Sequence, residues 1–183
     1  MAKVVFLDRD GVLNQYPGDG NYVTCLKEFK LLPGTIESIK KLKKAGFKIF
    51  ITSNQSGVAK GKYSKKTLRQ IDRKLKFKLW LHRTSIDGIY YCIHSDQDNC
   101  LCRKPKTGLL NKAITSLKEK VELSFFIGDS FTDINTAKNF GAQSILLLSG
   151  KENLKNRKNW DFEPDYIFDN LLLASNFLLN NYA

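Results

Sequence analysis

Short apolar runs alternate along this sequence with longer segments of helical periodicity, and this alternation restricts the folds open to it. The runs, rich in β-branched and aromatic residues, predict strands at residues 4–7, 47–52, 88–93, 123–127, 144–148 and 166–168. The segments between them predict helices at residues 36–43, 65–81 with Ser64 as N-cap, 108–120 and 131–140, and a last helix from about residue 170. We therefore predict an α/β fold in three layers, a Rossmann-like, doubly wound parallel sheet with helices on both faces.

One domain is expected to account for residues 1–183. This length is usual for a single domain, and neither a linker nor an internal repeat divides the chain. Hydrophobic residues make up 42% and charged residues 26% of the sequence, proportions that exclude disordered chains and disulfide scaffolds. The predicted strands and helices fill the intervals between the polar motifs described below. We therefore expect no cap domain and an open site.

The charge of the chain indicates anionic partners without selecting one. Thirty Lys and Arg against eighteen Asp and Glu give a net charge of +12, which attracts phosphorylated metabolites, nucleic acids or membrane surfaces. No apolar run approaches the roughly 20 residues of a membrane span, and the N-terminus lacks a signal-peptide pattern. We expect a cytoplasmic monomer with no membrane partner.

Polar motifs follow four of the predicted strands, at the points where the strands end. The motifs are Asp8-x-Asp10, Ser53-Asn54, Arg103-Lys104 and Gly128-Asp129 with Asp133. A single Asp after a strand is more often a turn or N-cap residue. The carboxyl ends of parallel strands, however, meet at one edge of the sheet, where such folds bind their ligands. Four motifs in this order therefore predict a shared site, and carboxylates two residues apart suit Mg²⁺.

In these motifs the sequence resembles the haloacid dehalogenase-like phosphatases. The family's four motifs are matched in order, over most of the chain, by Asp8-x-Asp10, Ser53, Lys104 and Gly128-Asp129 with Asp133. The resemblance implies a haloacid dehalogenase-like fold and Mg²⁺-dependent hydrolysis of phosphomonoesters through an aspartyl-phosphate. It also implies that Ser53 and Lys104 bind the reacting phosphate.

The acidic residues of the motifs receive their expected roles from the same resemblance. Asp8 is expected to attack phosphorus, in preference to Asp10, which is expected to act as the general acid and base. Asp8, the Asp10 carbonyl and Asp129 are expected to hold Mg²⁺, with Asp133 supporting them. These roles meet the needs of phosphoryl transfer, which are a nucleophile, an acid for the leaving alcohol and positive charge for the phosphoryl oxygens.

Three of the four cysteines cluster with a histidine just before the third motif. The potential ligands are Cys92, His94, Cys100 and Cys102. Two ligand pairs across a short loop are typical of a closed structural Zn²⁺ site, whereas a lone cysteine would be interpreted as a core residue. Arg103 and Lys104 follow directly, so Zn²⁺ is expected to fix the loop that presents these cations. Cys25 is expected to be a small buried residue.

The zinc motif narrows the resemblance to a branch that includes phosphatases of heptose 1,7-bisphosphate and of histidinol phosphate. Segments 8–11, 54–61, 88–92 and 102–105 look more like the heptose enzymes. The five-residue spacer between His94 and Cys100 looks more like the histidinol enzymes, and Ser130 stands where heptose enzymes often carry Lys. We predict D-glycero-D-manno-heptose 1,7-bisphosphate, cleaved at C7, as the substrate, with histidinol phosphate as the alternative.

An open site leaves substrate selection to short loops. The candidates are segments 16–22 and 55–62 and the cysteine-containing loop, although the first could equally be an ordinary connection. A sugar bisphosphate carries a second phosphate that needs cations at the rim. The expected substrate-binding residues are Asn54, Gln55, Lys60 and Arg103. Histidinol phosphate would instead require acidic or aromatic groups such as Tyr16, Asp19 and Tyr22.

A nucleic-acid function competes with the enzyme, because basic residues crowd the helices predicted at 36–43 and 65–81. Basic helical faces are usually solvated, and the acidic site would repel a nucleic-acid backbone in the absence of Mg²⁺. We therefore expect a small phosphorylated metabolite as the main partner, not nucleic acid. A 3′-phosphatase that acts on nucleic-acid ends is a third reading that keeps the same chemistry.

Overall fold

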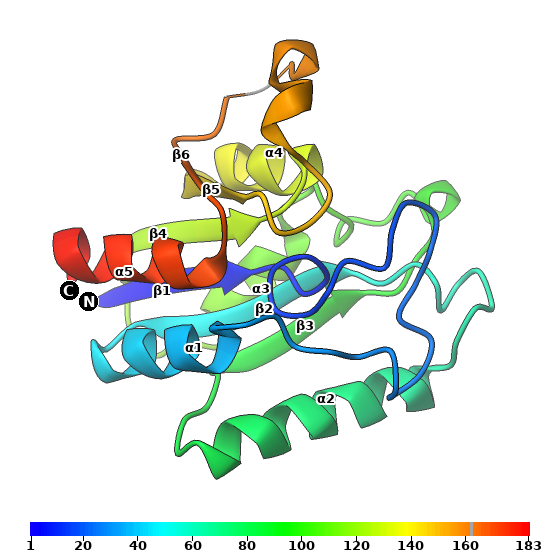
Figure 1. Cartoon of the computed structure of the whole chain (residues 1–183), viewed down its shortest axis with the longest axis horizontal. Helices are drawn as coiled ribbons and strands as arrows, with labels where there is room; N and C mark the ends of the chain where they lie inside the picture. The colour runs from blue at the N-terminus through cyan, green and yellow to red at the C-terminus, as the bar shows by residue number, and fades with distance from the viewer. Residues whose placement is uncertain (162) are drawn as a thin grey trace.

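Within residues 1–161 and 163–183, which the computed structural model describes, six parallel strands form one sheet at the centre of the protein (Figure 1). The strands are β1 (Ala2–Leu7), β2 (Lys48–Asn54), β3 (Gly88–Cys92), β4 (Val121–Gly128), β5 (Gln143–Leu147) and β6 (Tyr166–Phe168). Their order across the sheet is β3-β2-β1-β4-β5-β6, and every neighbouring pair is parallel. The predicted doubly wound α/β fold is confirmed.

Helices cover both faces of this sheet. They are α1 (Thr35–Lys44), α2 (Lys65–Leu81), α3 (Gly108–Thr115), α4 (Phe131–Phe140) and α5 (Leu171–Tyr182). The buried side chains of α1, α2 and α5 pack on one face, and those of α3 and α4 pack on the other. Between the strands, the described part of the chain holds only these helices, two 3₁₀ segments and loops, so no cap domain is inserted there.

The core follows the alternation of side chains along β1. Val5 and Leu7 point to the α1 and α5 side, whereas Val4 and Phe6 point to the α3 and α4 side. Phe6 lies opposite Phe50 of β2 and Phe126 of β4 in the strand register, and its ring centroid is 6.1 and 6.3 Å from theirs. All three rings are fully buried, so the centre of the sheet is its most apolar part.

Most of the predicted elements lie where the sequence places them. Ser64 caps α2 as predicted, since its Oγ accepts a hydrogen bond from the backbone N of Thr67. The predicted extension of α3 to residue 120 is wrong, because the helix ends at Thr115. Val121 already pairs with Ala2, whose backbone N donates to the carbonyl of the residue before Val121, so the chain must turn into β4 earlier.

The carboxyl ends of the strands point to one edge of the sheet, and the two ends of the chain lie together at the opposite edge (Figure 1). Lys3 Nζ donates to the carbonyl oxygen of Tyr182, which links the start of β1 to the end of α5. Among the residues described here, no helix combines the length and apolar character that crossing a membrane requires.

Candidate active site

A cavity of about 290 Å³ opens where the strands end. Its lining includes all the residues predicted for catalysis and Mg²⁺ binding, which are Asp8, Asp10, Ser53, Lys104, Asp129 and Asp133. Three predicted substrate-binding residues, Asn54, Gln55 and Arg103, line it as well. The fourth, Lys60, is exposed outside this lining, with its Nζ 5.8 Å from the centre of the Tyr22 ring.

Four buried charged side chains form the floor of this cavity. Lys104 Nζ donates to Asp8 Oδ1 at 2.6 Å and to Asp133 Oδ1 at 2.5 Å. Asp129 lies beside them, and no member of the four is more than 7% exposed. Burial raises the pKa of Asp8 to about 6, although the Lys104 ammonium opposes this rise. Three carboxylates thus share one buried ammonium, which leaves an excess of negative charge.

The ends of β1 and β4 place the carboxylates of this floor. Asp8 directly follows β1, and its backbone N donates to the carbonyl of Ile127 at 3.0 Å, which continues the ladder between the two strands. Asp129 follows β4 in the same way. Asp133 lies in the first turn of α4, where its Oδ2 accepts from the backbone N of Asp129 and from Ser130 Oγ, at 3.2 and 2.7 Å. A carboxylate at this helix end is also favoured by the helix dipole.

Two glycines make room for the Asp129 carboxylate. A Cβ at Gly11 would lie 2.1 Å from Asp129 Oδ2, and a Cβ at Gly150 would lie 2.0 Å from the same atom. The backbone N of Lys151 donates to this Oδ2 at 2.8 Å. Burial, and then the neighbouring Asp133 carboxylate, raise the pKa of Asp129 well above its usual range. A carboxylate confined in this way is suited to a bound cation.

Carboxylate oxygens of Asp8, Asp129 and Asp133 all lie within 4.8 Å of one another. Hard oxygen ligands and the excess negative charge at this point fit Mg²⁺. The carboxylate of Asp10 lies apart from this group, in contact with Arg9 and Gln55. The predicted ligand at Asp10 is its backbone carbonyl, so the position of the side chain is compatible with that prediction.

The loop that carries Lys104 is tied to β2. Asn54 Nδ2 donates to the carbonyl of Lys104, and the backbone N of Lys104 donates back to Asn54 Oδ1, both at 3.1 Å. Ser53 Oγ, on the same strand, accepts from Gln55 Nε2 at 3.2 Å. The amide of Asn54, which the sequence assigns to substrate, is therefore engaged in holding Lys104.

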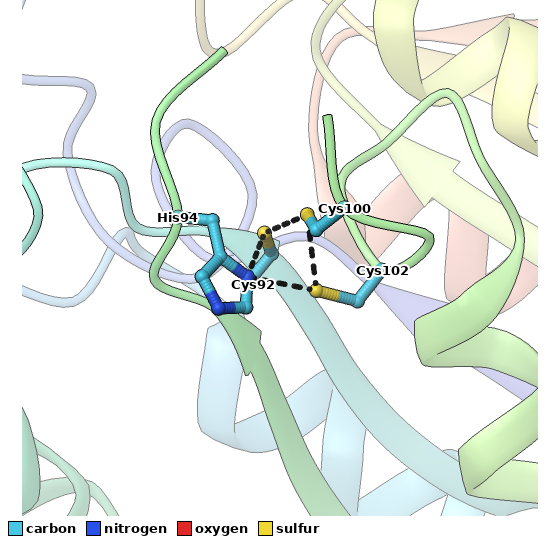
Figure 2. Close-up of side chains that lie close together, drawn as sticks. All are labelled: Cys92, His94, Cys100 and Cys102. Carbon is cyan, nitrogen blue, oxygen red and sulfur yellow. Dashed lines mark hydrogen bonds between the residues drawn. The ribbon is translucent and has the colours of Figure 1, made fainter. Parts of the chain in front are cut away.

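The predicted zinc ligands converge on one point beside the cavity (Figure 2). Cys100 Sγ lies 3.5 Å from Cys92 Sγ and 3.4 Å from Cys102 Sγ. His94 Nδ1 lies 3.3 Å from Cys102 Sγ and 3.7 Å from Cys92 Sγ. A tetrahedral site with Zn–S bonds of about 2.3 Å has S···S edges of about 3.8 Å, so the four groups fit the size and donor chemistry of a closed zinc site.

Arg103 connects this cluster to the cavity. Its Nε donates to Asp96 Oδ1 at 2.5 Å and its Nη1 to the carbonyl of His94 at 3.4 Å, while its side chain lines the cavity. None of the four cysteines forms a disulfide. Cys25 is only half-buried, so the prediction of a buried residue there is wrong. It lies in a loop, at a bend of the chain outside every helix and strand.

The segment at residues 16–22 forms one wall of the cavity. Tyr16, Asp19 and Tyr22 belong to the lining, and the Tyr16 hydroxyl donates to Asp19 Oδ1 at 2.6 Å. Lys151 lines the cavity too, and its Nζ lies 3.6 Å from the same Asp19 oxygen. Lys151 is not among the predicted site residues, although it lies shortly after the strand predicted at residues 144–148, the kind of position that identified the other motifs.

Known proteins resemble the chain in both sequence and structure. A HAD-hydrolase-like family model matches residues 101–174. The D-glycero-β-D-manno-heptose-1,7-bisphosphate 7-phosphatase of Pseudomonas putida is 35% identical over 177 residues, which cover 97% of this chain and 99% of that protein. The enzyme of the same name from Helicobacter pylori is 36% identical over 159 residues, or 86% of this chain and 90% of that one.

A solved structure with a similar fold carries ligands. The crystal structure of D,D-heptose 1,7-bisphosphate phosphatase from B. bronchiseptica, complexed with magnesium and phosphate, matches with a TM-score of 0.88 and 30% sequence identity. The match covers 97% of this chain and 98% of that one. The similarity therefore extends over the sheet, both helical layers and the loops at the cavity.

Proposed function

The chain belongs to the haloacid dehalogenase-like phosphatase family of these heptose bisphosphate phosphatases, and on that premise we propose that it removes the C7 phosphate of D-glycero-β-D-manno-heptose 1,7-bisphosphate. The observation that carries the chemistry is the buried cluster of three carboxylates around Lys104 at the floor of the cavity. The choice of sugar and anomer is supported by the names of the relatives that match nearly the whole chain.

The first half of the reaction transfers the phosphoryl group to Asp8. A carboxylate oxygen of Asp8 attacks phosphorus while the bond between phosphorus and the C7 oxygen breaks. The C7 oxygen leaves with a proton that Asp10 gives up. Lys104 holds Asp8 in position and offsets the negative charge of the phosphoryl oxygens, and Ser53 donates to one of them.

Water completes the reaction in the second half. The Asp10 carboxylate takes a proton from a water molecule whose oxygen attacks the aspartyl-phosphate. The bond between phosphorus and the Asp8 oxygen breaks, inorganic phosphate leaves, and both carboxyl groups return to their starting states. Asp10 lines the cavity near Asp8, as this sequence of proton transfers requires.

Two metals complete the proposed enzyme. Asp8, Asp129 and the Asp10 carbonyl would hold Mg²⁺ with support from Asp133, and bound Mg²⁺ supplies positive charge to the phosphoryl oxygens. The magnesium and phosphate in the B. bronchiseptica structure support this assignment. The cluster of three cysteines and His94 would hold Zn²⁺, which has a structural role in keeping Arg103 and Lys104 beside the cavity.

The walls of the cavity support a substrate with a second phosphate. Arg103 and Lys151 both belong to the lining, so cations are available beyond the buried floor. Lys60 would contribute only if the substrate extends past the Tyr22 ring.

The cavity and the cysteine cluster are complete within one chain, which supports a monomer built as one domain. None of the four cysteines forms a disulfide, which supports a reducing compartment such as the cytoplasm.

A comparison of substrates tests the proposal. The purified protein is assayed with heptose 1,7-bisphosphate, histidinol phosphate and a 3′-phosphorylated oligonucleotide, each with and without Mg²⁺, and with Asp8→Asn as the inactive control. We expect Mg²⁺-dependent release of phosphate, with kcat/KM highest for the heptose bisphosphate. A ratio of tenfold or more in favour of another substrate, about 1.4 kcal/mol in transition-state binding, would reassign the enzyme to that substrate.

A further inference from the structure

The guanidinium of Arg9 lies directly behind the Asp10 carboxylate, and we propose that Arg9 is a positioning residue that aims the Asp10 acid at the leaving oxygen of the substrate. The inference rests on the proposed phosphatase function. It gives a task to a residue that stands inside the first motif and to which none of the roles above is assigned.

Arg9 and two amide side chains fix both oxygens of Asp10. Arg9 donates to Oδ1 from Nε and Nη2, at 3.1 and 2.9 Å, and to Oδ2 from Nη2, at 2.8 Å. Asn14 Nδ2 donates to Oδ1 at 2.8 Å, and Gln55 Nε2 donates to Oδ2 at 2.9 Å. The Asp10 side chain is still 19% exposed and lines the cavity. It is thus held from the protein side and open to the substrate.

Arg9 is itself held by groups from distant parts of the chain. Its Cζ lies 5.8 Å from the centre of the Tyr91 ring on β3, which is within the range of a cation–π contact. The Tyr91 hydroxyl donates to Asp72 Oδ1 on α2 at 2.7 Å. On the other side of Asp10, Gln55 Oε1 accepts from the Tyr63 hydroxyl at 2.5 Å. The acid therefore sits at the end of a buried network with little freedom to rotate.

A purely structural role accounts poorly for this arginine. Its side chain is fully buried, and its Nη1 finds no hydrogen-bond partner among the residues that the structure describes. An unused donor on a buried cation is unfavourable, and an unbranched apolar side chain such as Met would fill the same space without it. What Met could not supply is the planar fork that grips the carboxylate.

Substrates with different leaving groups can distinguish a positioning role of Arg9 from a purely structural one. When Asp8 attacks a sugar phosphate, the departing alkoxide is a strong base and needs the proton of Asp10. The 2,4-dinitrophenolate ion is stable in water at neutral pH, so it leaves without that proton. The later attack of water on the aspartyl-phosphate also uses Asp10 and is common to both substrates, but kcat/KM reports only the first half of the reaction, in which the leaving group departs. In kcat/KM, a residue that only aims Asp10 therefore affects the first substrate and spares the second, whereas a residue that supports the whole site affects both.

The experiment measures kcat/KM for heptose 1,7-bisphosphate and for 2,4-dinitrophenyl phosphate in the wild type, Arg9→Met, Arg9→Lys and Asp10→Asn. We expect Arg9→Met to lose about 100-fold or more on the sugar phosphate and less than about fivefold on the aryl phosphate, as Asp10→Asn does. Arg9→Lys keeps the charge but not the fork, so it should show a smaller loss on the sugar phosphate alone.

A control variant far from the site shows whether the substrate ratio responds to Arg9 specifically. Asp165→Ala removes a carboxylate that binds the backbone N and hydroxyl of Ser144, at the opposite edge of the sheet, and should leave the ratio of the two substrates unchanged. Equal losses on both substrates in the Arg9 variants would overturn the inference alone. A wild-type enzyme that hydrolyses neither would remove the proposed function as well. If Arg9→Met fails to fold, Arg9→Lys decides by the same ratio.

Discussion

Asp129 occupies its buried position because glycines stand on both sides of it. Either added Cβ would come within 2.1 Å of its Oδ2 atom, far inside van der Waals contact. At Gly11 the backbone φ is +85°, so alanine would be strained there even without the contact. Gly150 has no such strain, which makes it the cleaner position for a test.

We predict that Gly150→Ala weakens Mg²⁺ binding by about 10- to 100-fold, the usual effect of disturbing a group that orients a metal ligand. The added methyl group would lie 2.0 Å from Asp129 Oδ2, so the carboxylate must leave the position it holds beside Asp8 and Asp133. Activity as a function of Mg²⁺ concentration measures the effect. Gly46→Ala is the control for backbone strain without a contact at the site, because alanine is strained at its φ of +87° but meets no atom around its Cβ position, so its Mg²⁺ requirement should not change. An unchanged Mg²⁺ requirement in Gly150→Ala would contradict the role of this glycine.

At the scale of elements, one side chain joins β2 to the loop that follows β3. Asn54 exchanges two hydrogen bonds with the backbone of Lys104, whose ammonium must reach Asp8 and Asp133. The loop has a second attachment from α4, where Asn139 Nδ2 donates to the carbonyl of Pro105 at 3.0 Å. Asn139 is exposed, so its hydrogen bond competes with water.

We predict that Asn54→Ala lowers kcat/KM by about tenfold or more, because each lost hydrogen bond contributes about 1 kcal/mol to the position of the loop. Asn139→Ala, the matched variant on the other side of the same loop, should change it by less than about threefold. Steady-state kinetics and urea unfolding of both variants measure the two effects. A larger loss in Asn139→Ala would show that α4, and not β2, positions the loop.

The elements could be predicted where burial repeats with a regular period. The α2 helix agrees with its predicted limits because Ser64 and the stripe of Leu68, Ile71, Leu75 and Leu79 are local signals. The end of α3 could not be predicted in this way. It depends on the pairing of Val121 with Ala2, two residues that are far apart in the sequence, with two other strands of the sheet between them along the chain.

The residues of the site likewise divide into those that local sequence signals predict and those that only the packing of distant elements brings together. Residues directly after strands, such as Asp8 and Asp129, could be predicted because parallel strands bring their ends together. The surroundings of Arg9 could not, since Tyr91 and Asp72 meet it only through the packing of β3 and α2. Lys60, predicted to bind substrate, lies outside the cavity lining with its Nζ 5.8 Å from the centre of the Tyr22 ring, and nothing in its local sequence indicates this position.

At the scale of the molecule, the cysteine cluster joins separate segments around the loop of Arg103 and Lys104. Cys92 ends β3, whereas Cys100 and Cys102 come after a short 3₁₀ segment at Asp96–Asp98. A metal held between them would stabilise the folded chain, because the unfolded chain does not present the four ligands together.

We predict one Zn²⁺ per chain, and Cys100→Ser should lower both the zinc content and Tm, the latter by about 10 °C. Added Mg²⁺ should not restore the activity of this variant, because the two metals have different ligands and different tasks. Cys25→Ser is the matched control and should keep both zinc and Tm, since Cys25 is outside the cluster. Elemental analysis and thermal unfolding measure the outcome. A wild-type protein purified without chelators and free of zinc would refute the assignment.

The pairing of Lys3 with Tyr182 bears on how the enzyme can be handled outside the cell. Both ends of the chain emerge at one pole of the molecule, and the cavity opens at the other (Figure 1). An affinity tag, a bead or a fused carrier domain at either end therefore lies at the edge of the sheet opposite the cavity and leaves the mouth of the cavity facing the solution. The same adjacency lets a short peptide splice the two ends into a ring without crossing the path of the substrate.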